Sequence, residues 1–347
     1  MRTTSNSFLY TFATLILTIC GLSLHAQGHS LPEYVPAPVK IPTGASYLQS
    51  DGTVLIVGAD SMEAVLKKWD ALFEKTHPGV RFKLLLKGSS TGIGGLTAGV
   101  SALAPMGREA WESDLRPFRF VYGYPPTDIL VGHSGYAAAG RVSPPGIYVN
   151  SKNPLPGLTV AQAARIFTSG DPAGDISQWS QLDMTGRWAA RTIHLYGPRD
   201  DGGFATSLRT RLMGGHAFAS RYEPAPQFKD VIQAVSEDPY AMGLVGFYDS
   251  TQLPKNVRML PLSMGNGSPD SSASYTEVMD GRYPFEPALH IYVNRAPGEP
   301  MGGLVKEYLL LVLSRQGQQA IAEEKGSSNG CVPLSVDEVM VQRRKLF

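Results

Sequence analysis

Residues 54–96 read VLIVGADSMEAVLKKWDALFEKTHPGVRFKLLLKGSSTGIGGL, and this stretch determines the fold class. Val54 to Gly58 is an apolar run that ends in glycine, which is typical of a buried strand. From about Ser61 to Thr76, apolar side chains recur at helical spacing. Val80 to Leu86 predicts a second strand, and Ile93 to Val100 predicts a short helix. Strand, helix, strand and helix in such short succession predict a parallel, doubly wound α/β sheet.

The length of 347 residues predicts two lobes, because one compact core rarely holds so long a chain. We expect residues 51–147 and 286–347 to form lobe I and residues 148–285 to form lobe II. Each lobe is then a doubly wound sheet with flanking helices, and hinge strands join the two. Further strands are predicted at Thr192–Tyr196, Gly243–Tyr248 and Leu289–Val293, and further helices at Thr159–Phe167, from Phe204, at Phe228–Val235 and at Leu304–Lys325.

The N-terminus predicts export. Arg2 supplies a positive start, Phe8 to Leu24 is largely apolar, and Ala26 suits a cleavage point. Residues 1–26 are therefore expected to be a signal peptide, and the mature protein to be periplasmic or secreted. An uncleaved anchor helix is the alternative. Residues 27–50 are rich in proline and predict an extended linker.

Charge and cysteine content exclude several kinds of partner. Removal of residues 1–26 takes away one basic residue, Arg2, from 31, which leaves 30 basic against 30 acidic residues. A neutral chain argues against nucleic acid as a partner. Only Cys331 survives cleavage, so no internal disulfide is expected. The histidines show no metal-ligand spacing. We expect a monomer with no metal and no cofactor.

Three loops share one design, in which a strand ends, a small or hydroxyl-bearing turn follows and a helix begins. They are Ala59–Ser61, Gly88–Gly92 and Arg199–Gly203. A helix N-terminus offers unpaired backbone N–H groups and partial positive charge, so it can bind an anion. Hydroxyls add donors, and the Arg199 guanidinium can bind an oxoanion through two hydrogen bonds. The pattern predicts a small-oxoanion site, with ordinary helix caps as the alternative.

The stretch GSSTGIGGLTAG, residues 88–99, resembles the glycine–serine turn and helix of the phosphate-binding proteins that serve phosphate ABC transporters. Four further regions extend the resemblance over about residues 53–330: YVNSKNPL at 148–155, ARIF at 164–167 with ISQW at 176–179, YPFEPALHIYVN at 283–294, and residues 304–318. This resemblance implies a type II periplasmic-binding fold with the ligand between two lobes. It also implies a non-enzymatic solute-binding protein, phosphate as the oxoanion, and an ABC permease as partner.

Carried over by position, the resemblance implies ligand contacts from Ser61 and the Met62 amide, and from the hydroxyl of Ser89. Ser90 and Thr91 lie at the same helix start. Arg199 corresponds to the arginine that clamps the anion.

Two positions depart from the family pattern. The family's Ser-Gly-Thr run is here Gly203-Phe204-Ala205, preceded by Gly202 and followed by Thr206. An acceptor aspartate of the family is missing from residues 105–108, which end in the cation Arg108. We include Gly202, Gly203, Thr206 and Arg108 among the ligand-binding residues. The departures favour a more generic anion site, a different anion or a site that has decayed.

Two other functions stay open. Gly88–Gly92 also fits the G-x-S-x-G nucleophile elbow, which would make Ser90 the nucleophile of a serine hydrolase. An exported sensor or adhesion protein could use the same fold without transport, because fold alone does not fix function.

Overall fold

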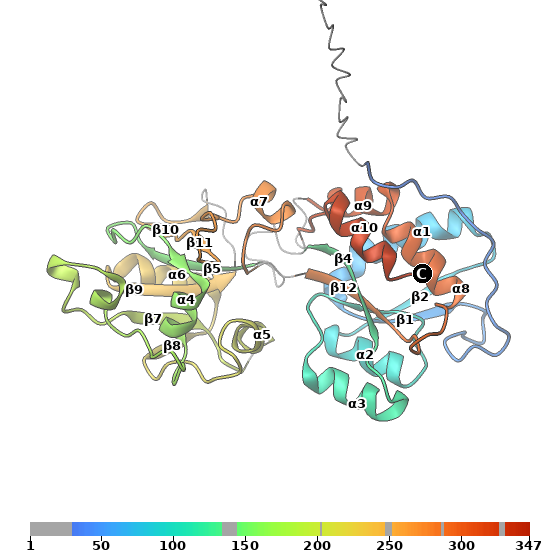
Figure 1. The fold of residues 1–347 in the computed structure, drawn as a ribbon, viewed down its shortest axis with the longest axis horizontal. Helices are drawn as coiled ribbons and strands as arrows, with labels where there is room; N and C mark the ends of the chain where they lie inside the picture. Colours follow the sequence, from blue (N-terminus) through green and yellow to red (C-terminus); the bar gives the residue numbers. More distant parts are fainter. Residues whose placement is uncertain (1–29, 134–143, 202, 247–251, 286–287, 326–329) are drawn as a thin grey trace, which may run out of the picture. The chain divides into compact units, whose positions relative to one another are not determined.

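The computed structural model describes residues 30–133, 144–201, 203–246, 252–285, 288–325 and 330–347. These residues form two sets of sheets with separate apolar cores (Figure 1). We call residues 30–133 and 288–347 the first lobe, and residues 144–285 the second lobe. Within the described ranges, no helix combines the length and apolar character needed to cross a membrane.

The first lobe begins with the predicted strand–helix–strand unit. Strand β1 (Val54–Gly58) pairs in parallel with β2 (Phe82–Leu86). The short 3-10 turn η1 (Asp60–Met62) and helix α1 (Glu63–Thr76) connect the two strands. This confirms the α/β interpretation of residues 54–86.

Helix α2 (Ser89–Thr97) starts four residues earlier than the sequence suggests. Lys87 and Gly88 connect β2 to α2, and Gly88 has a φ of 109° that glycine adopts without steric cost. The expected tight turn over residues 88–92 is therefore wrong, and the serine-rich segment forms the first turn of a helix.

A second sheet of the first lobe has the order β3-β12-β4, with antiparallel pairing throughout. Its strands are β3 (Ala104–Met106), β12 (Ala288–Val293) and β4 (Thr127–His133). Helix α3 (Glu112–Tyr122) packs against α2, and helix α10 (Val336–Arg344) packs against β4. The sequence did not predict α3 or α10.

The predicted helix from Leu304 to Lys325 is two helices, α8 (Gly303–Val312) and α9 (Arg315–Ala322). The chain breaks at Ser314, whose Oγ accepts a hydrogen bond from the Gly317 amide at 3.2 Å and so caps α9. The single-helix prediction failed because apolar residues continue across the break.

The main core of the first lobe lies among α1, α8 and α9, which contact one another (Figure 1). Buried Trp69 of α1 donates from Nε1 to the Gly317 carbonyl oxygen at 2.9 Å. Side chains from the proline-rich N-terminal stretch, among them Leu31, Tyr34 and Ile41, pack against this core. Residues 31–48 therefore lie on the first lobe.

The second lobe is built on a five-stranded sheet of order β10-β5-β9-β7-β8. Its strands are β5 (Pro145–Asn150), β7 (His194–Pro198), β8 (Tyr222–Ala225), β9 (Ala241–Gly246) and β10 (Val257–Met259). Strand β7 pairs in parallel with β8 and β9, as a doubly wound sheet requires, and β5 pairs antiparallel with β9. Of the predicted strand Gly243–Tyr248, residues 247–248 lie outside the described residues.

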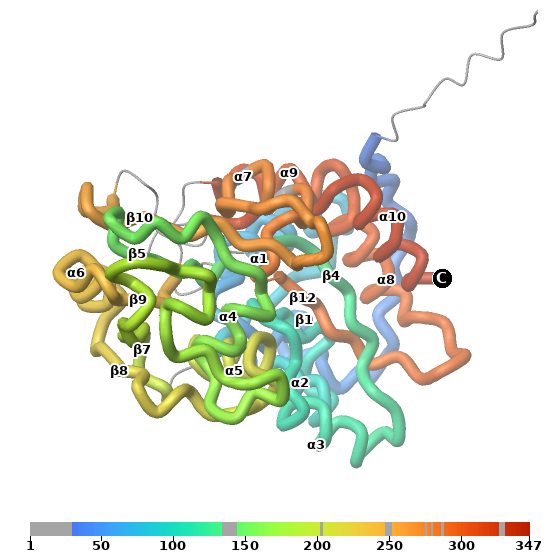
Figure 2. The backbone as a smooth tube through the Cα atoms, turned by 60° about the vertical axis from the view of Figure 1, so that its left-hand side comes forward, coloured from blue at the N-terminus to red at the C-terminus, as the bar shows by residue number. Residues whose placement is uncertain are grey.

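Helices and a small sheet complete the second lobe. They are α4 (Val160–Phe167), α5 (Gly203–Arg211), α6 (Phe228–Glu237), α7 (Tyr275–Met279) and the parallel pair β6 (Leu158–Thr159) and β11 (Leu262–Ser263). Helix α6 packs against β9, β5 and β7 (Figure 2). Helix α5 follows β7 directly, which sets the loop between them at a strand end.

Candidate anion-binding site

Backbone hydrogen bonds join the end of β1 to the loop that follows β2, and the loop that follows β1 to β3. The Gly58 carbonyl oxygen, at the end of β1, accepts from the amides of Lys87 and Gly88 at 3.0 and 3.1 Å. The Ala59 amide donates to the Pro105 carbonyl oxygen at 2.9 Å. A Cβ at Gly58 would lie 2.3 Å from that Pro105 oxygen, so only glycine permits this close approach.

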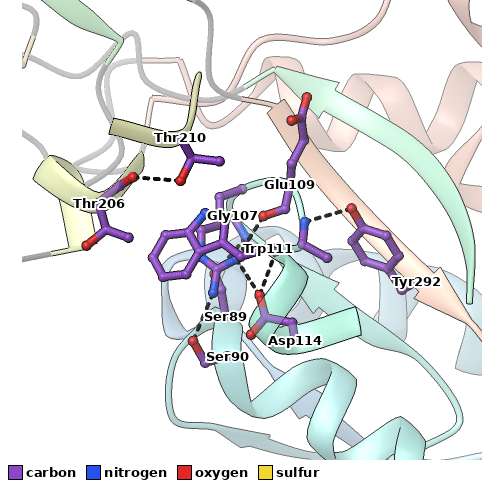
Figure 3. Close-up of polar contacts among 11 residues, drawn as sticks. Ser89, Ser90, Gly107, Glu109, Trp111, Asp114, Thr206, Thr210 and Tyr292 are labelled. Atoms are coloured by element: carbon purple, nitrogen blue, oxygen red, sulfur yellow. Dashed lines mark hydrogen bonds and ion pairs between the residues drawn. The ribbon is translucent and has the colours of Figure 1, made fainter. Parts of the chain in front are cut away.

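Side chains fasten the loop after β3 to the start of α2. The Gly107 amide donates to Ser89 Oγ at 3.1 Å, and Arg108 Nη2 donates to Ser90 Oγ at 2.8 Å (Figure 3). Thr91 has a different role, because its hydroxyl donates to the Gly88 carbonyl oxygen at 2.7 Å. The two serines are therefore linked to the loop after β3, and Thr91 stabilises the turn.

Arg108 is held on several sides. Its Nη1 donates to Asp114 Oδ2 and to the Glu109 carbonyl oxygen, each at 2.8 Å. Its guanidinium carbon lies 3.5 Å from the centre of the Trp111 ring, close enough for a cation–π contact. The structure thus gives this cation partners within its own lobe.

The sequence interpretation missed Trp111, Asp114 and Tyr292. The Asp114 carboxylate also accepts from the Trp111 amide at 2.8 Å and so caps α3, while Tyr292 Oη accepts from the Ala110 amide at 2.9 Å (Figure 3). An acidic residue three positions after a helix start is a known capping signal, and it could have revealed α3. The contact from Tyr292 has no local signal, because it crosses from β12.

The first predicted ligand loop uses its amides internally. The Ser61 amide donates to Asp60 Oδ1 at 3.1 Å, and the Met62 amide donates to the Ala59 carbonyl oxygen at 3.2 Å. The Met62 side chain is fully buried in the core of the first lobe. The Met62 amide, expected to face a ligand, thus has a partner in the η1 turn.

Arg199, at the end of β7, pairs with Asp201 two residues later. Its Nε and Nη2 donate to the two carboxylate oxygens of Asp201 at 3.1 and 2.6 Å. These hydrogen bonds raise the pKa of the Arg199 guanidinium and lower the pKa of the Asp201 carboxyl group. Both side chains are exposed, at 69% and 62%. Arg199 is therefore a charged, solvent-accessible donor.

The rest of the second-lobe loop lies at the start of α5. Gly203 is the first residue of α5, and Gly202 lies outside the described residues. Thr206 follows one turn later, and its carbonyl oxygen accepts from the Thr210 hydroxyl at 3.0 Å (Figure 3).

The structure brings Ser89, Ser90, Thr91 and Arg108 into one network, with the loop of Ser61 and Met62 joined to it through Ala59 and Pro105. Such a network offers hydroxyl donors at a helix N-terminus, which suits an anion. It suits a hydrolase less well, because Ser90 Oγ is hydrogen-bonded by the Arg108 guanidinium, which cannot accept a proton from a nucleophile.

Two α/β lobes, with a hydroxyl-lined helix start at the strand ends of one lobe, are the arrangement expected of the two-lobed periplasmic-binding fold. The chain belongs to the PBP superfamily domain family, whose family model matches residues 43–316.

Relatives within this class include phosphate-binding proteins. The chain is 29% identical over 308 residues to the phosphate-binding protein PstS of Pseudomonas aeruginosa PAO1, covering 88% of this chain and 87% of the relative. Its fold is similar to that of PstS from Borrelia burgdorferi, with a TM-score of 0.59 at 16% identity, over 82% of this chain and 99% of the other. An ABC-type phosphate transport receptor from Vibrio cholerae gives a TM-score of 0.54 at 17% identity, over 81% and 99% of the two chains.

Proposed function

We propose that this protein is an exported solute-binding protein that captures phosphate or a close oxoanion for an ABC importer. The observation that carries the proposal is the joining of three loops at the start of α2, where Ser89 and Ser90 are held by the loop after β3. The names of the relatives support phosphate as the oxoanion and a phosphate transporter as the partner.

In the proposed mechanism, the anion binds at the first turn of α2. The first amides of a helix lack acceptors in a preceding turn, so those of Ser89 and Ser90 donate to the bound anion together with nearby hydroxyls. The Thr91 amide instead donates to the Gly88 carbonyl oxygen at 3.0 Å. Ser61, Met62, Ser89, Ser90, Thr91 and Arg108 form or support this half of the site. Arg199, Gly202, Gly203 and Thr206 contribute from the second lobe, where the Arg199 guanidinium adds charge-assisted hydrogen bonds.

Capture changes no covalent bond, so it needs no catalytic residue and no cofactor. The bound form is what a membrane permease recognises. We further propose cleavage after residue 26, a periplasmic or secreted location, and a monomeric receptor. Cleavage and export follow from the N-terminal apolar run.

Thermal unfolding with a panel of oxoanions tests the proposal. A ligand that binds only the folded state raises the melting temperature in proportion to the logarithm of its concentration over Kd. We expect phosphate to raise the melting temperature more than sulfate, molybdate or a phosphonate does. A protein that responds to no oxoanion would instead support the sensor or adhesion role.

A further inference from the structure

We propose that Arg108 is a positioning residue that aims the Ser90 hydroxyl at the oxoanion and makes no direct contact with it. This inference rests on the proposed function, because it concerns the same site. It departs from the expectation that Arg108 adds positive charge for the ligand.

The hydrogen bonds of Arg108 fix its orientation. Its Nη1 atom uses both hydrogens, on Asp114 Oδ2 and the Glu109 carbonyl oxygen, and the Trp111 ring covers the guanidinium at 3.5 Å. Nη2 then donates to Ser90 Oγ. A planar group held at three points has a fixed orientation, so the Nη2 hydrogen that Ser90 accepts points in one direction.

The charge of Arg108 is already compensated. Its side chain is 15% exposed and that of Asp114 is 6% exposed, and the two form an ion pair at 2.8 Å. An anion that bound Arg108 directly would break its ion pair with Asp114. The Asp114 carboxylate would then stay buried without a partner, which costs free energy. Asp114 cannot turn away cheaply, because it also accepts from the Trp111 amide and caps α3.

The hydroxyl of Ser90 is left as a donor. A serine oxygen that accepts a hydrogen bond keeps its own hydrogen, and guanidinium groups only donate. Among the described residues, that hydrogen has no acceptor, and Ser90 is exposed. The neighbouring Ser89 oxygen likewise accepts from the Gly107 amide. Two adjacent hydroxyls thus present hydrogens, which suits the acceptor oxygens of an ionised tetrahedral oxoanion.

A double-mutant cycle on the purified protein tests this role, with Kd for inorganic phosphate measured by titration calorimetry. Arg108→Ala and Ser90→Ala should each weaken binding about tenfold. The double variant should bind no more than about twofold more weakly than Ser90→Ala, because Arg108 acts through Ser90. A double variant weakened by the product of the two effects, about a hundredfold, would overturn the inference.

Two further variants separate positioning from direct charge. Arg108→Gln keeps a neutral donor for Ser90 and should bind better than Arg108→Ala, whereas a direct charge contact predicts equal losses. Ser90→Thr keeps the hydroxyl and should restore most of the affinity lost in Ser90→Ala. The salt dependence of Kd should be the same in Arg108→Ala and wild type, because an ion pair with the ligand would steepen it only in wild type.

Arg119→Ala is the matched control, since Arg119 is a nearby arginine on α3, the helix that carries Asp114, and it pairs with Glu112 at the surface. It should keep wild-type affinity. Circular dichroism checks that α3 survives in each variant, and Arg108→Gln carries the test if Arg108→Ala unfolds. A wild-type protein with no oxoanion affinity would overturn the proposed function and this inference together. A wild-type protein that binds, with additive losses, would overturn this inference alone.

Discussion

The backbone amide of Gly107 donates a hydrogen bond to the hydroxyl oxygen of Ser89 over 3.1 Å. This bond joins the loop after β3 to the first residue of α2. Because the Ser89 oxygen accepts, its hydrogen is available to a ligand. The hydrogen bond from the loop therefore orients the Ser89 hydroxyl as a donor at the N-terminus of α2.

Ser89→Ala should weaken phosphate binding about tenfold, since it removes one donor to the anion and the acceptor of the Gly107 amide. Titration calorimetry measures the change. Ser180→Ala, at an exposed position of the second lobe, is the control and should leave Kd unchanged. Equal affinities for Ser89→Ala and wild type would remove Ser89 from the site.

Arg199→Ala should weaken phosphate binding by at least about tenfold, because charge-assisted hydrogen bonds to an oxoanion are stronger than neutral ones. The same loss is not expected for Arg187→Ala, which removes another exposed arginine of the second lobe. Calorimetry on both variants gives the comparison. Wild-type affinity in Arg199→Ala would contradict the assignment of Arg199 as the clamp.

Alanine at two adjacent glycines of α2, Gly94 and Gly95, should change the free energy of unfolding in opposite directions. A Cβ at Gly95 would lie 2.9 Å from Val57 Cβ, so Gly95→Ala should separate α2 from β1 and lower the free energy of unfolding by about 1–3 kcal/mol. A Cβ at Gly94 meets nothing within 4 Å, so Gly94→Ala should raise it by about 0.5–1 kcal/mol. Chemical denaturation measures the free energy of unfolding of each variant. A Gly94→Ala variant less stable than wild type would show that a methyl group at this position does not fit beside α2.

Ionisation of the buried Asp70 carboxyl group should lower the free energy of unfolding as pH rises. Burial raises the pKa of the Asp70 carboxyl group from 3.8 to about 7, against the opposing effect of the Tyr308 hydroxyl that donates to it at 2.7 Å. Nearby Glu74 adds to the increase. The folded state therefore holds the proton more tightly than the unfolded state, and the stability contributed by protonated Asp70 is lost as pH rises from about 4 through 7.

Asp70→Asn keeps an acceptor for Tyr308 and cannot ionise. It should raise the free energy of unfolding by about 2–4 kcal/mol at pH 8 and by much less at pH 4. Urea denaturation at the two pH values gives the difference. An advantage of the same size at both would show that Asp70 does not ionise in this range.

Local sequence patterns predicted much of the fold. Strand β1 agrees residue for residue with the apolar run Val54–Gly58, because a buried strand that ends at glycine carries its own signal. The break between α8 and α9 was missed, since the apolar pattern continues through Leu313 and the break depends on the cap at Ser314. Patterns of apolarity therefore locate elements better than they locate helix ends.

The candidate site could be predicted only in part. Ser89 and Ser90 were identified because a hydroxyl-rich helix start has a recognisable local sequence. The ion pair of Arg108 with Asp114 was not, because it needs β3, α2 and α3 to be assembled first. Sequence thus identified the candidate donors, and the structure added the hydrogen bonds that orient their hydroxyls.

Titration calorimetry of phosphate into the purified protein tests the central claim most directly. The account predicts saturable binding at one site per chain with a Kd of about a micromolar or tighter, equivalent to about −8 kcal/mol. Sulfate, arsenate and molybdate titrated in parallel define how selective the site is. Absence of heat and of competition for every one of these oxoanions would contradict the claim that this protein captures an oxoanion.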